Sequence, residues 1–451
     1  VPIVKRNADY ASASEALTVM DRFSGSVLWT RTARYSFRHN AVAAAGNRIF
    51  CIDAISEKKM SFLKRRGYTI SAKPVLYALD ARTGRELWKA DSNIFGTWLG
   101  YSEEHDLLLQ AGSRARDRAR DEAGKGMTVY RGIDGSVLWR SSRKYSGPCL
   151  LHHETIITQR NAFSLLTGKP IRRTNPVTGR PMPWTFKRMY GCNTVIGSEN
   201  MLTFRSAAAG FFGLGNMGGT GNLGGFKSGC TSNLIAADGV LAAPDYTRTC
   251  TCSYQNQASL AMVHMPGTEM WTFNDFAWNG ERVKRLGLNF GAPGDRMADS
   301  GTLWLDSPSV GGPSPKVPVT VKGARVRYFR NHSMYVKEGA MKWVTASGVT
   351  GADSITVTLA RNADDTCAYT VRLYFADFTG TRAGRRVFDV SVQRKKVLSG
   401  FDIFKTAGGS ARGVMKEFTD ISAQESLRIS FSASAGESLV CGIEITETNG
   451  E

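Results

Sequence analysis

Two short runs in the sequence place histidine beside carboxylate side chains. They are Glu103-Glu104-His105-Asp106 and His152-His153-Glu154. Imidazole and carboxylate groups are ligands for zinc-type metals, and imidazole is also the usual group for acid–base catalysis near neutral pH. Adjacent side chains of a regular strand point to opposite faces, so His152 and His153 are not expected to act together. Loops that meet at one face could still gather His39, His105 and either His152 or His153. Structural hydrogen bonding is the ordinary alternative for all four.

A second chemistry is sugar binding, which needs flat aromatic faces next to planar hydrogen-bonding groups. Residues 184–190 and 246–257 interleave aromatic side chains with Arg, Lys, Asn and Gln. The candidates for such a groove are Trp184, Tyr190, Tyr254 and Gln255. An ordinary turn-rich wall has the same composition. No Ser-His-Asp set, HExxH motif or close carboxylate pair identifies a reaction.

The charge of the chain favours polyanionic partners. Among 451 residues, 58 Lys and Arg outweigh 39 Asp and Glu, which gives a net charge of +19. The excess is spread along the chain without a recognisable nucleic-acid module, so an acidic polysaccharide or anionic surface is favoured over nucleic acid. No apolar run approaches the ~20 residues of a transmembrane helix. No signal peptide precedes Val1, so either none existed or it has been removed.

Cysteine usage indicates the compartment. Four of the eight cysteines fall in a Gly-rich, turn-rich stretch that has little apolar side chain to bury: Cys192, Cys230, Cys250 and Cys252. Disulfides are the usual way to stabilise such a stretch, so two bridges among these four are expected, in an oxidising, extracytoplasmic compartment. The alternative is that they are buried free thiols.

The first half of the chain repeats one pattern: an apolar strand, an Asp, a turn ending in Gly, a second strand and a Trp. The Asp can accept hydrogen bonds from the turn amides, and Gly supplies the positive φ that closes the turn. A hairpin cannot bury the Trp alone, so stacked neighbouring sheets are required, as in a β-propeller. The residues expected to make these docking contacts are Asp21, Gly25, Trp29, Asp80, Gly84, Trp88, Gly135 and Trp139.

These repeats resemble the PQQ-type β-propeller family, whose blades carry such a tryptophan-docking motif. The resemblance implies a propeller over residues 1–305, with incomplete or degenerate blades. The quinoprotein dehydrogenases of that family hold PQQ with a vicinal disulfide and a calcium-held acid. Here Thr251 separates Cys250 from Cys252, and no two cysteines are adjacent. Bound PQQ is therefore not expected, whereas a divalent metal stays open.

Residues 306–319 are rich in Pro, Gly and Ser and predict an extended linker. The following residues, 320–451, alternate short strands with turns, which is typical of an antiparallel β-sandwich. Four segments of this region resemble the malectin domain in order and spacing: 368–377, 385–390, 397–403 and 441–445. The fold class expected for the whole chain is therefore all-β, a PQQ-type propeller followed by a malectin-like sandwich.

The malectin resemblance implies a domain that binds glucose-type disaccharides or other glycans through loop aromatics and an acid. The loop 377–384 holds one aromatic residue where the family has two, and the acid is matched loosely by Glu437. The candidate sugar-binding residues are Tyr328, Arg330, His332, Tyr335, Phe378, Arg385 and Glu437. For the four in the first loop, apolar packing or interdomain contact is the alternative.

Three functions are compatible with these features. The leading one is an extracytoplasmic glycan-binding or scaffold protein, with the propeller as platform and the sandwich as recognition module; basic charge favours uronate-bearing or sulfated glycans. The second is a polysaccharide lyase or hydrolase with its site on the central face of the propeller. The third is an assembly module that docks partner proteins of the cell envelope. Since no catalytic set is identified, the sequence favours a binding protein over an enzyme.

Overall fold

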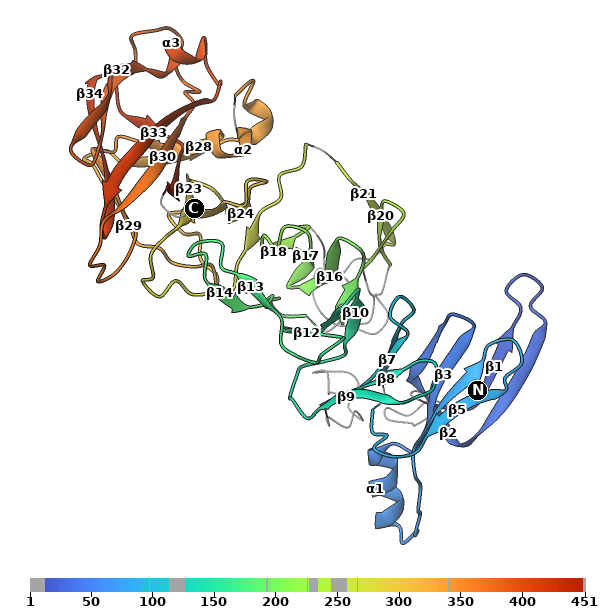
Figure 1. The fold of residues 1–451 in the computed structure, drawn as a ribbon. Coiled ribbons are helices and arrows are strands. Elements are labelled where there is room, and N and C mark those ends of the chain that lie inside the picture. Colours follow the sequence, from blue (N-terminus) through green and yellow to red (C-terminus); the bar gives the residue numbers. More distant parts are fainter. Residues whose placement is uncertain are drawn as a thin grey trace.

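The computed structural model describes residues 13–96, 98–112, 126–191, 194–224, 226, 234–244, 258–265, 267–339 and 341–448 (Figure 1). In these ranges the chain is nearly all β, as the sequence predicts. The helices are short: α1 (Glu57–Arg65), η2 (Ser333–Tyr335), α2 (Lys342–Thr345) and α3 (Ile403–Ala407).

The first two sheets are antiparallel, with strands in chain order. The strands of the first are β1 (Ala13–Met20), β2 (Val27–Ala45), β3 (Arg48–Asp53), β4 (Val75–Asp80) and β5 (Glu86–Ala90). Those of the second are β6 (Trp98–Ser102), β7 (Leu107–Gly112), β8 (Gly126–Arg131) and β9 (Val137–Ser141). The long strand β2 pairs mainly by its first half with β1 and by its second half with β3, so it joins one hairpin to the next four-stranded unit.

Smaller sheets continue the series toward the middle of the molecule (Figure 1). One contains β10 (Leu150–His152), β11 (Thr155–Ile157) and β12 (Ala162–Ser164), and the hairpin β13 (Arg172–Thr174)–β14 (Pro181–Pro183) follows it. The next contains β15 (Ile196–Gly197), β16 (Met201–Ser206), β17 (Ala208–Gly213), β18 (Thr220–Asn222) and β22 (Thr272–Phe273). Another contains β19 (Ile235–Ala237), β20 (Val240–Ala243) and β21 (Leu260–Val263). Strands of successive sheets are neighbours: β6, the first strand of its sheet, contacts β2 of the preceding sheet and β10 of the next one, and β10 contacts β15.

The repeated tryptophans join these sheets in series. Each indole Nε1 donates to a carbonyl in the turn of the next repeat; for Trp29 that turn lies in the same five-stranded sheet, and for Trp88 and Trp139 it lies in the following sheet. Trp29 donates to Ala81 at 2.9 Å, Trp88 to Gly132 at 2.8 Å and Trp139 to Leu165 at 2.7 Å. Each ring also lies over the glycine of that turn, namely Gly84, Gly135 and Gly168, where a Cβ would come within 2.9 Å of the ring. Glycine is needed there both for its positive φ and for this close approach.

The turn aspartates behave as the repeat pattern expects. Asp80 Oδ1 accepts hydrogen bonds from the amides of Arg82 and Thr83 and from the Thr83 hydroxyl, and Asp21 makes the equivalent bonds in the first copy. Arg131 stands at this position in the third copy, yet the Gly135 amide still donates to its carbonyl at 3.0 Å. The backbone therefore closes the turn, and the aspartate adds to it.

The C-terminal sheets form a sandwich around one large core, which includes Leu288 and Ile443 from one sheet and Ile355 and Ile429 from the other. The larger sheet runs β24 (Arg296–Met297), β25 (Leu303–Ser307), β23 (Arg285–Phe290), β36 (Gly442–Glu447), β30 (Cys367–Phe375), β33 (Val414–Ala423). The facing sheet runs β26 (Val319–Lys322), β29 (Ser354–Thr358), β34 (Ser426–Ala435), β31 (Val387–Val392), β32 (Lys395–Asp402). A third, small sheet contains β27 (Arg327–Arg330), β28 (Ser347–Thr350) and β35 (Leu439–Val440).

The strand pairing crosses the division expected after residue 305. Strand β23 pairs with β36 and with β25, and Leu286 and Trp304 are buried in the sandwich core. Residues 285–307 therefore lie in the C-terminal sheet and not with the repeats, and the Pro/Gly/Ser segment 306–319 connects two parts of the sandwich. The composition of that segment predicted a connection but not which sheets it connects.

Candidate functional site

The loop of residues 377–386, on the sandwich, is held by a buried ion pair. Arg386 Nε lies 2.8 Å from Asp377 Oδ2, and Arg386 Nη1 donates to the Glu437 carbonyl at 2.6 Å. Asp377 Oδ1 also accepts from the amides of Thr379 and Gly380. Burial raises the pKa of Asp377, but Arg386 and the Thr379 hydrogen bonds outweigh it, and the net pKa is lowered. The loop is thus fixed before any ligand arrives.

Charged groups lie around this loop. Glu437, expected as the sugar-binding acid, pairs with Arg327 Nη2 at 2.9 Å. Arg385 is exposed; it donates to Thr381 Oγ1 at 3.4 Å and has no ion pair within the described ranges. It can therefore meet an anionic group without first breaking an existing ion pair.

Aromatic side chains lie on the neighbouring strand β27 and on η2. Tyr328 is 40% exposed and Tyr335 is 62% exposed. Phe378 is half-buried and its ring packs on that of Phe329 at 6.2 Å, so it supports the loop more than it offers a free face.

Arg330 and His332 are engaged in local contacts. Glu269, whose side chain is almost fully buried, accepts from the Ser333 amide at 2.5 Å and lies 3.8 Å from Arg330. His332 Nδ1 accepts from the Met334 amide and begins η2. These contacts are an ion pair and a capping hydrogen bond, not the apolar packing considered as an alternative for these residues. Glu269, which contacts Arg330 and the Ser333 amide, was not singled out in the sequence because it lies far from them along the chain.

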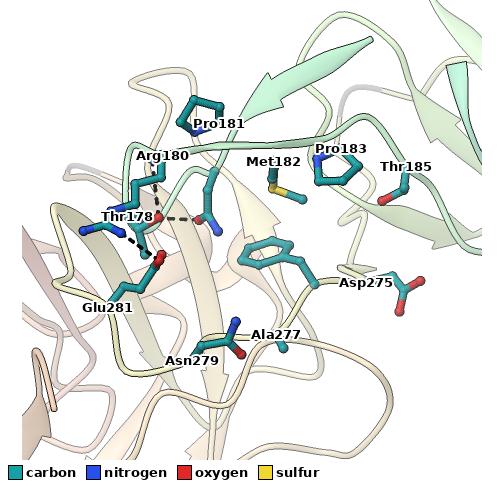
Figure 2. Close-up of a pocket in the computed structure, with 12 residues that line it drawn as sticks. Thr178, Arg180, Pro181, Met182, Pro183, Thr185, Asp275, Ala277, Asn279 and Glu281 are labelled. Atoms are coloured by element: carbon teal, nitrogen blue, oxygen red, sulfur yellow. Dashed lines mark hydrogen bonds and ion pairs between the residues drawn. The ribbon is translucent and has the colours of Figure 1, made fainter. Parts of the chain in front are cut away.

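A pocket of about 460 Å³ lies between the β13–β14 hairpin and residues 275–281, and the sequence analysis did not predict it (Figure 2). Its wall combines the apolar side chains of Pro181, Met182 and Phe276 with amide, hydroxyl and charged groups. An ion pair between Arg180 and Glu281 at 3.0 Å joins its two sides. The lining comes from segments about 100 positions apart, so sequence spacing carries no signal for it.

The groove predicted on the repeats is not formed by Trp184. The Trp184 ring is buried in a core cluster against Phe186 and Phe212, where it contributes to the packing of this turn-rich region. Tyr190 is exposed, with the Arg205 guanidinium 5.5 Å from its ring centre. Tyr254 and Gln255 lie outside the described residues.

The four cysteines expected to form disulfides, Cys192, Cys230, Cys250 and Cys252, also lie outside the described residues. Elsewhere, Cys51 and Cys441 are buried free thiols. Burial raises the pKa of each to about 12, so both are unreactive near neutral pH.

Three of the four candidate histidines come together on the repeats, contrary to the expectation that His152 and His153 face apart. Strand β10 ends at His152, and His153 enters the turn with a φ of +48°, so strand alternation stops between them. Their rings lie 4.7 Å apart. His153 Nε2 lies 3.0 Å from Glu199 Oε1, and His153 Nδ1 lies 3.5 Å from Glu104 Oε2. His105 Nε2 approaches the other oxygen of Glu104 at 3.7 Å.

The carboxylates set the ionisation of this cluster. The hydrogen bond and charge of Glu199, followed by those of Glu104, raise the pKa of His153, and His153 in turn lowers the pKa of Glu199. His39 does not join the cluster, because it lies on β2 and shares a 2.7 Å hydrogen bond with Ser14 Oγ. Sequence spacing could not reveal Glu199, which comes from the turn between β15 and β16.

Comparison with protein-family models identifies both parts of the chain. Residues 352–449 match the malectin domain, and residues 4–144 match the PQQ-repeat model described as outer membrane protein assembly factor BamB. The chain therefore combines PQQ-type repeats with a C-terminal malectin domain, which confirms both resemblances. No curated protein sequence matches the chain.

Solved structures resemble parts of the chain at low identity. A β-glucuronidase from Bacteroides uniformis is 14% identical over 47% of this chain and 22% of that chain, with a TM-score of 0.30. The ANXUR2 extracellular domain from Arabidopsis thaliana is 15% identical over 37% of this chain and 49% of that chain, with a TM-score of 0.28. The chain spans about a fifth of the first and half of the second.

Both matching domain types are typically extracellular or periplasmic, and the malectin match is consistent with a carbohydrate-related protein. Within the described ranges, no helix has the length and apolarity that crossing a bilayer requires.

Proposed function

We propose that the chain is an extracytoplasmic glycan-binding protein in which the repeats serve as platform and the malectin-type sandwich recognises the sugar. The observation that carries this proposal is the preformed 377–386 loop, in the part of the chain that matches malectin, together with the exposed Tyr328 and Tyr335 on β27 and η2 of the C-terminal part of the chain. Tyrosine rings stack on the apolar faces of sugars, while guanidinium and carboxylate groups bind sugar hydroxyls and acids.

The rigid loop supports binding because ordering a loop at the moment of binding would lower the affinity. Asp377 and Arg386 satisfy each other inside the loop, which leaves Arg385 exposed toward solvent. Together with the net charge of +19, this exposed cation favours glycans that carry uronate or sulfate groups.

The test is calorimetric titration of the full chain with neutral glucose-type disaccharides and with uronate-containing oligosaccharides. Arg385→Ala is expected to weaken uronate binding about tenfold, since an exposed charge-assisted hydrogen bond contributes about 1–1.5 kcal/mol. The matched control is Arg394→Ala, which removes an exposed arginine beyond the other end of β31 and should leave affinity unchanged.

A second pair of variants tests the aromatic contact. Tyr335→Ala should weaken both neutral and acidic glycans, whereas Tyr68→Ala removes a tyrosine of similar exposure, 59%, from the repeat region and should have no effect. If no glycan binds, or if Arg385→Ala and Tyr335→Ala bind as well as the parent, this proposal is wrong. In the second case the pocket between the β13–β14 hairpin and residues 275–281 is the next surface to substitute.

A further inference from the structure

The turns of three successive sheets meet on the repeat region. They are the turn between β6 and β7, which holds Glu104, the turn between β10 and β11, which holds His153, and the turn between β15 and β16, which holds Glu199. Because β10 contacts both β6 and β15, the turns that follow these strands lie at the same end of neighbouring sheets. Each turn therefore contributes a polar side chain to one place.

Three potential metal ligands converge there. One donor atom each from His152, His153 and Glu199 can be chosen so that all lie within 4.8 Å of one another. We propose that these three side chains bind a divalent transition-metal ion of the zinc type. Two imidazoles and one carboxylate form a ligand set that zinc uses where it keeps a further position open for water or another ligand. Imidazole nitrogen also selects against magnesium and calcium, which prefer oxygen ligands.

The donor atoms lie near the spacing that an ion requires. Metal–ligand bonds of about 2.0–2.2 Å require donor atoms roughly 3–3.5 Å apart. His153 Nε2 and Glu199 Oε1 already lie 3.0 Å apart, and a donor atom of His152 lies within 4.8 Å of those of the other two residues. His152 Nε2 shares a 2.8 Å hydrogen bond with the backbone carbonyl of Glu199, and binding of a metal through this atom would replace that bond. The side chains of His153 and Glu199 are 54% and 71% exposed, so they can rotate without disturbing the core.

Glu104 supplies an independent feature of a metal site. Its carboxylate lies 3.5 Å from the Nδ1 atom of His153, on the side of the ring opposite to Nε2. A carboxylate at the second nitrogen orients a metal-binding imidazole and increases its basicity. His105 Nε2 lies 3.7 Å from the other oxygen of Glu104, close enough for an ion pair but too far for a hydrogen bond. Glu104 is therefore a positioning residue, not a ligand.

The site belongs to the repeat region and shares no residue with the glycan-binding face, so each proposal can fail without the other. It is tested by titrating the chelator-treated full chain with Zn²⁺, Mg²⁺ and Ca²⁺ in a calorimeter. One Zn²⁺ site per chain is expected, without measurable binding of the two harder cations. Co²⁺ in place of Zn²⁺ should give visible absorption without the near-ultraviolet band of thiolate ligation, which separates this site from cysteines elsewhere in the chain.

The variants are chosen to preserve the fold. His153→Asn suits a positive φ, and Glu199→Gln keeps the size of the side chain; each should weaken Zn²⁺ binding at least tenfold. Glu104→Gln should weaken it by about 10–100-fold without altering the stoichiometry. His39→Ala, which removes a histidine outside the cluster, should bind as the parent does.

Circular dichroism verifies that each variant is folded, and Glu104→Gln, which leaves the ligands intact, keeps the test valid if one of the ligand variants fails to fold. Absence of a Zn²⁺ site in the parent overturns the proposal, as does unchanged affinity in folded His153→Asn or Glu199→Gln. Thiolate absorption with Co²⁺ that persists in these variants also overturns it, because the metal would then bind to cysteine.

Discussion

The repeat region and the C-terminal sandwich bury their apolar side chains in different ways. In the repeats the buried residues form several separate clusters; one joins Phe50 and Leu76 of the first sheet to Leu108 and Tyr130 of the second. In the sandwich a single cluster extends through both sheets and includes Leu286, Trp304, Val371 and Ile429. The repeats are thus held by a series of local interfaces, and the sandwich by one shared core.

This difference indicates how the stability of each region responds to a substitution. In a series of local interfaces, each unit is stabilised by its neighbours, so damage at one interface remains local. In a shared core, a cavity is felt by every strand that lines it, so the domain unfolds cooperatively. The difference between the regions also matches where the two proposed sites lie. The metal site is built from turns of three sheets, and the glycan site lies on a loop anchored to a rigid core.

The strongest test of the comparison is Trp304→Ala. Trp304 is fully buried, and its ring lies 5.7 Å from Trp343 and 5.3 Å from Tyr374. Removing it should lower the free energy of unfolding of the sandwich by about 3–5 kcal/mol, the usual result for a buried tryptophan. In denaturant unfolding followed by circular dichroism, the whole sandwich transition should shift to a lower denaturant concentration. Trp304→Phe should cost much less, because the buried indole N–H has no partner among the described residues.

The counterpart in the repeats is Trp88→Ala. Its half-buried ring packs on Phe50 and Gly135, and its Nε1 donates to Gly132. The loss should be about 2 kcal/mol and confined to the adjoining sheets. Hydrogen exchange should reveal faster exchange in β3 to β8 and unchanged protection in the sandwich. Trp88→Phe, which keeps most of the packing, should cost about 1 kcal/mol. Equal loss of protection in the sandwich would contradict the modular description.

A third test lies where the two regions meet. Asp295 is fully buried and accepts hydrogen bonds from Asn274 and Ser314, and burial raises its pKa from 3.8 to about 6. A raised pKa means that the folded state favours the protonated acid, so its contribution to stability is present below pH 3.8 and is lost as pH rises through 6.

Asp295→Asn should therefore stabilise the protein by about 1–2 kcal/mol at pH 8, and the difference should vanish near pH 3.5. The measurement is the unfolding temperature across this pH range. The exposed Asp299→Asn, which makes the same charge change, should have no comparable effect. If only the unfolding temperature of the sandwich changes, the two regions unfold separately. If the unfolding temperatures of the sandwich and the repeats change together, the junction couples the two regions. A destabilised Asp295→Asn at pH 8 would contradict the assigned pKa.

The sequence predicted the parts of the fold that depend on local patterns. Trp29, Trp88 and Trp139 stand at the same offset from a turn glycine, and docking depends on that offset, so the pattern was sufficient. The division after residue 305 failed for the opposite reason. Strand β23 pairs with β36 about 155 positions later, and a Pro-rich segment carries no information about long-range pairing.

Prediction of the sites was limited in the same way, because local patterns do not reveal contacts between remote parts of the chain. Strand alternation predicted that His152 and His153 face apart, but it holds only inside a strand, and the positive φ of His153 falls just beyond it. Glu199 and Glu269 were missed because their partners are remote in the sequence. Loop 377–384, which is continuous in sequence, was predicted as a binding loop from its resemblance to malectin, whereas the buried role of Arg386 was not predicted.

The smallest effect is expected at a turn of the repeats. Asp80 is partly exposed, and its hydrogen bonds with Thr83, above all from the hydroxyl, lower its pKa below the usual 3.8. A lowered pKa means that its contribution is present above pH 3.8 and is lost as pH falls through the lower folded value. Asp80→Ala should thus lower the unfolding temperature slightly at pH 7 and progressively less at more acidic pH. Ser164→Ala, at the equivalent position of the fourth copy, where a hydroxyl instead of a carboxylate accepts from the Thr167 amide, should lack this acid dependence. A loss as large as that of Trp88→Ala would mean that the turn, and not the docked indole, holds successive sheets together.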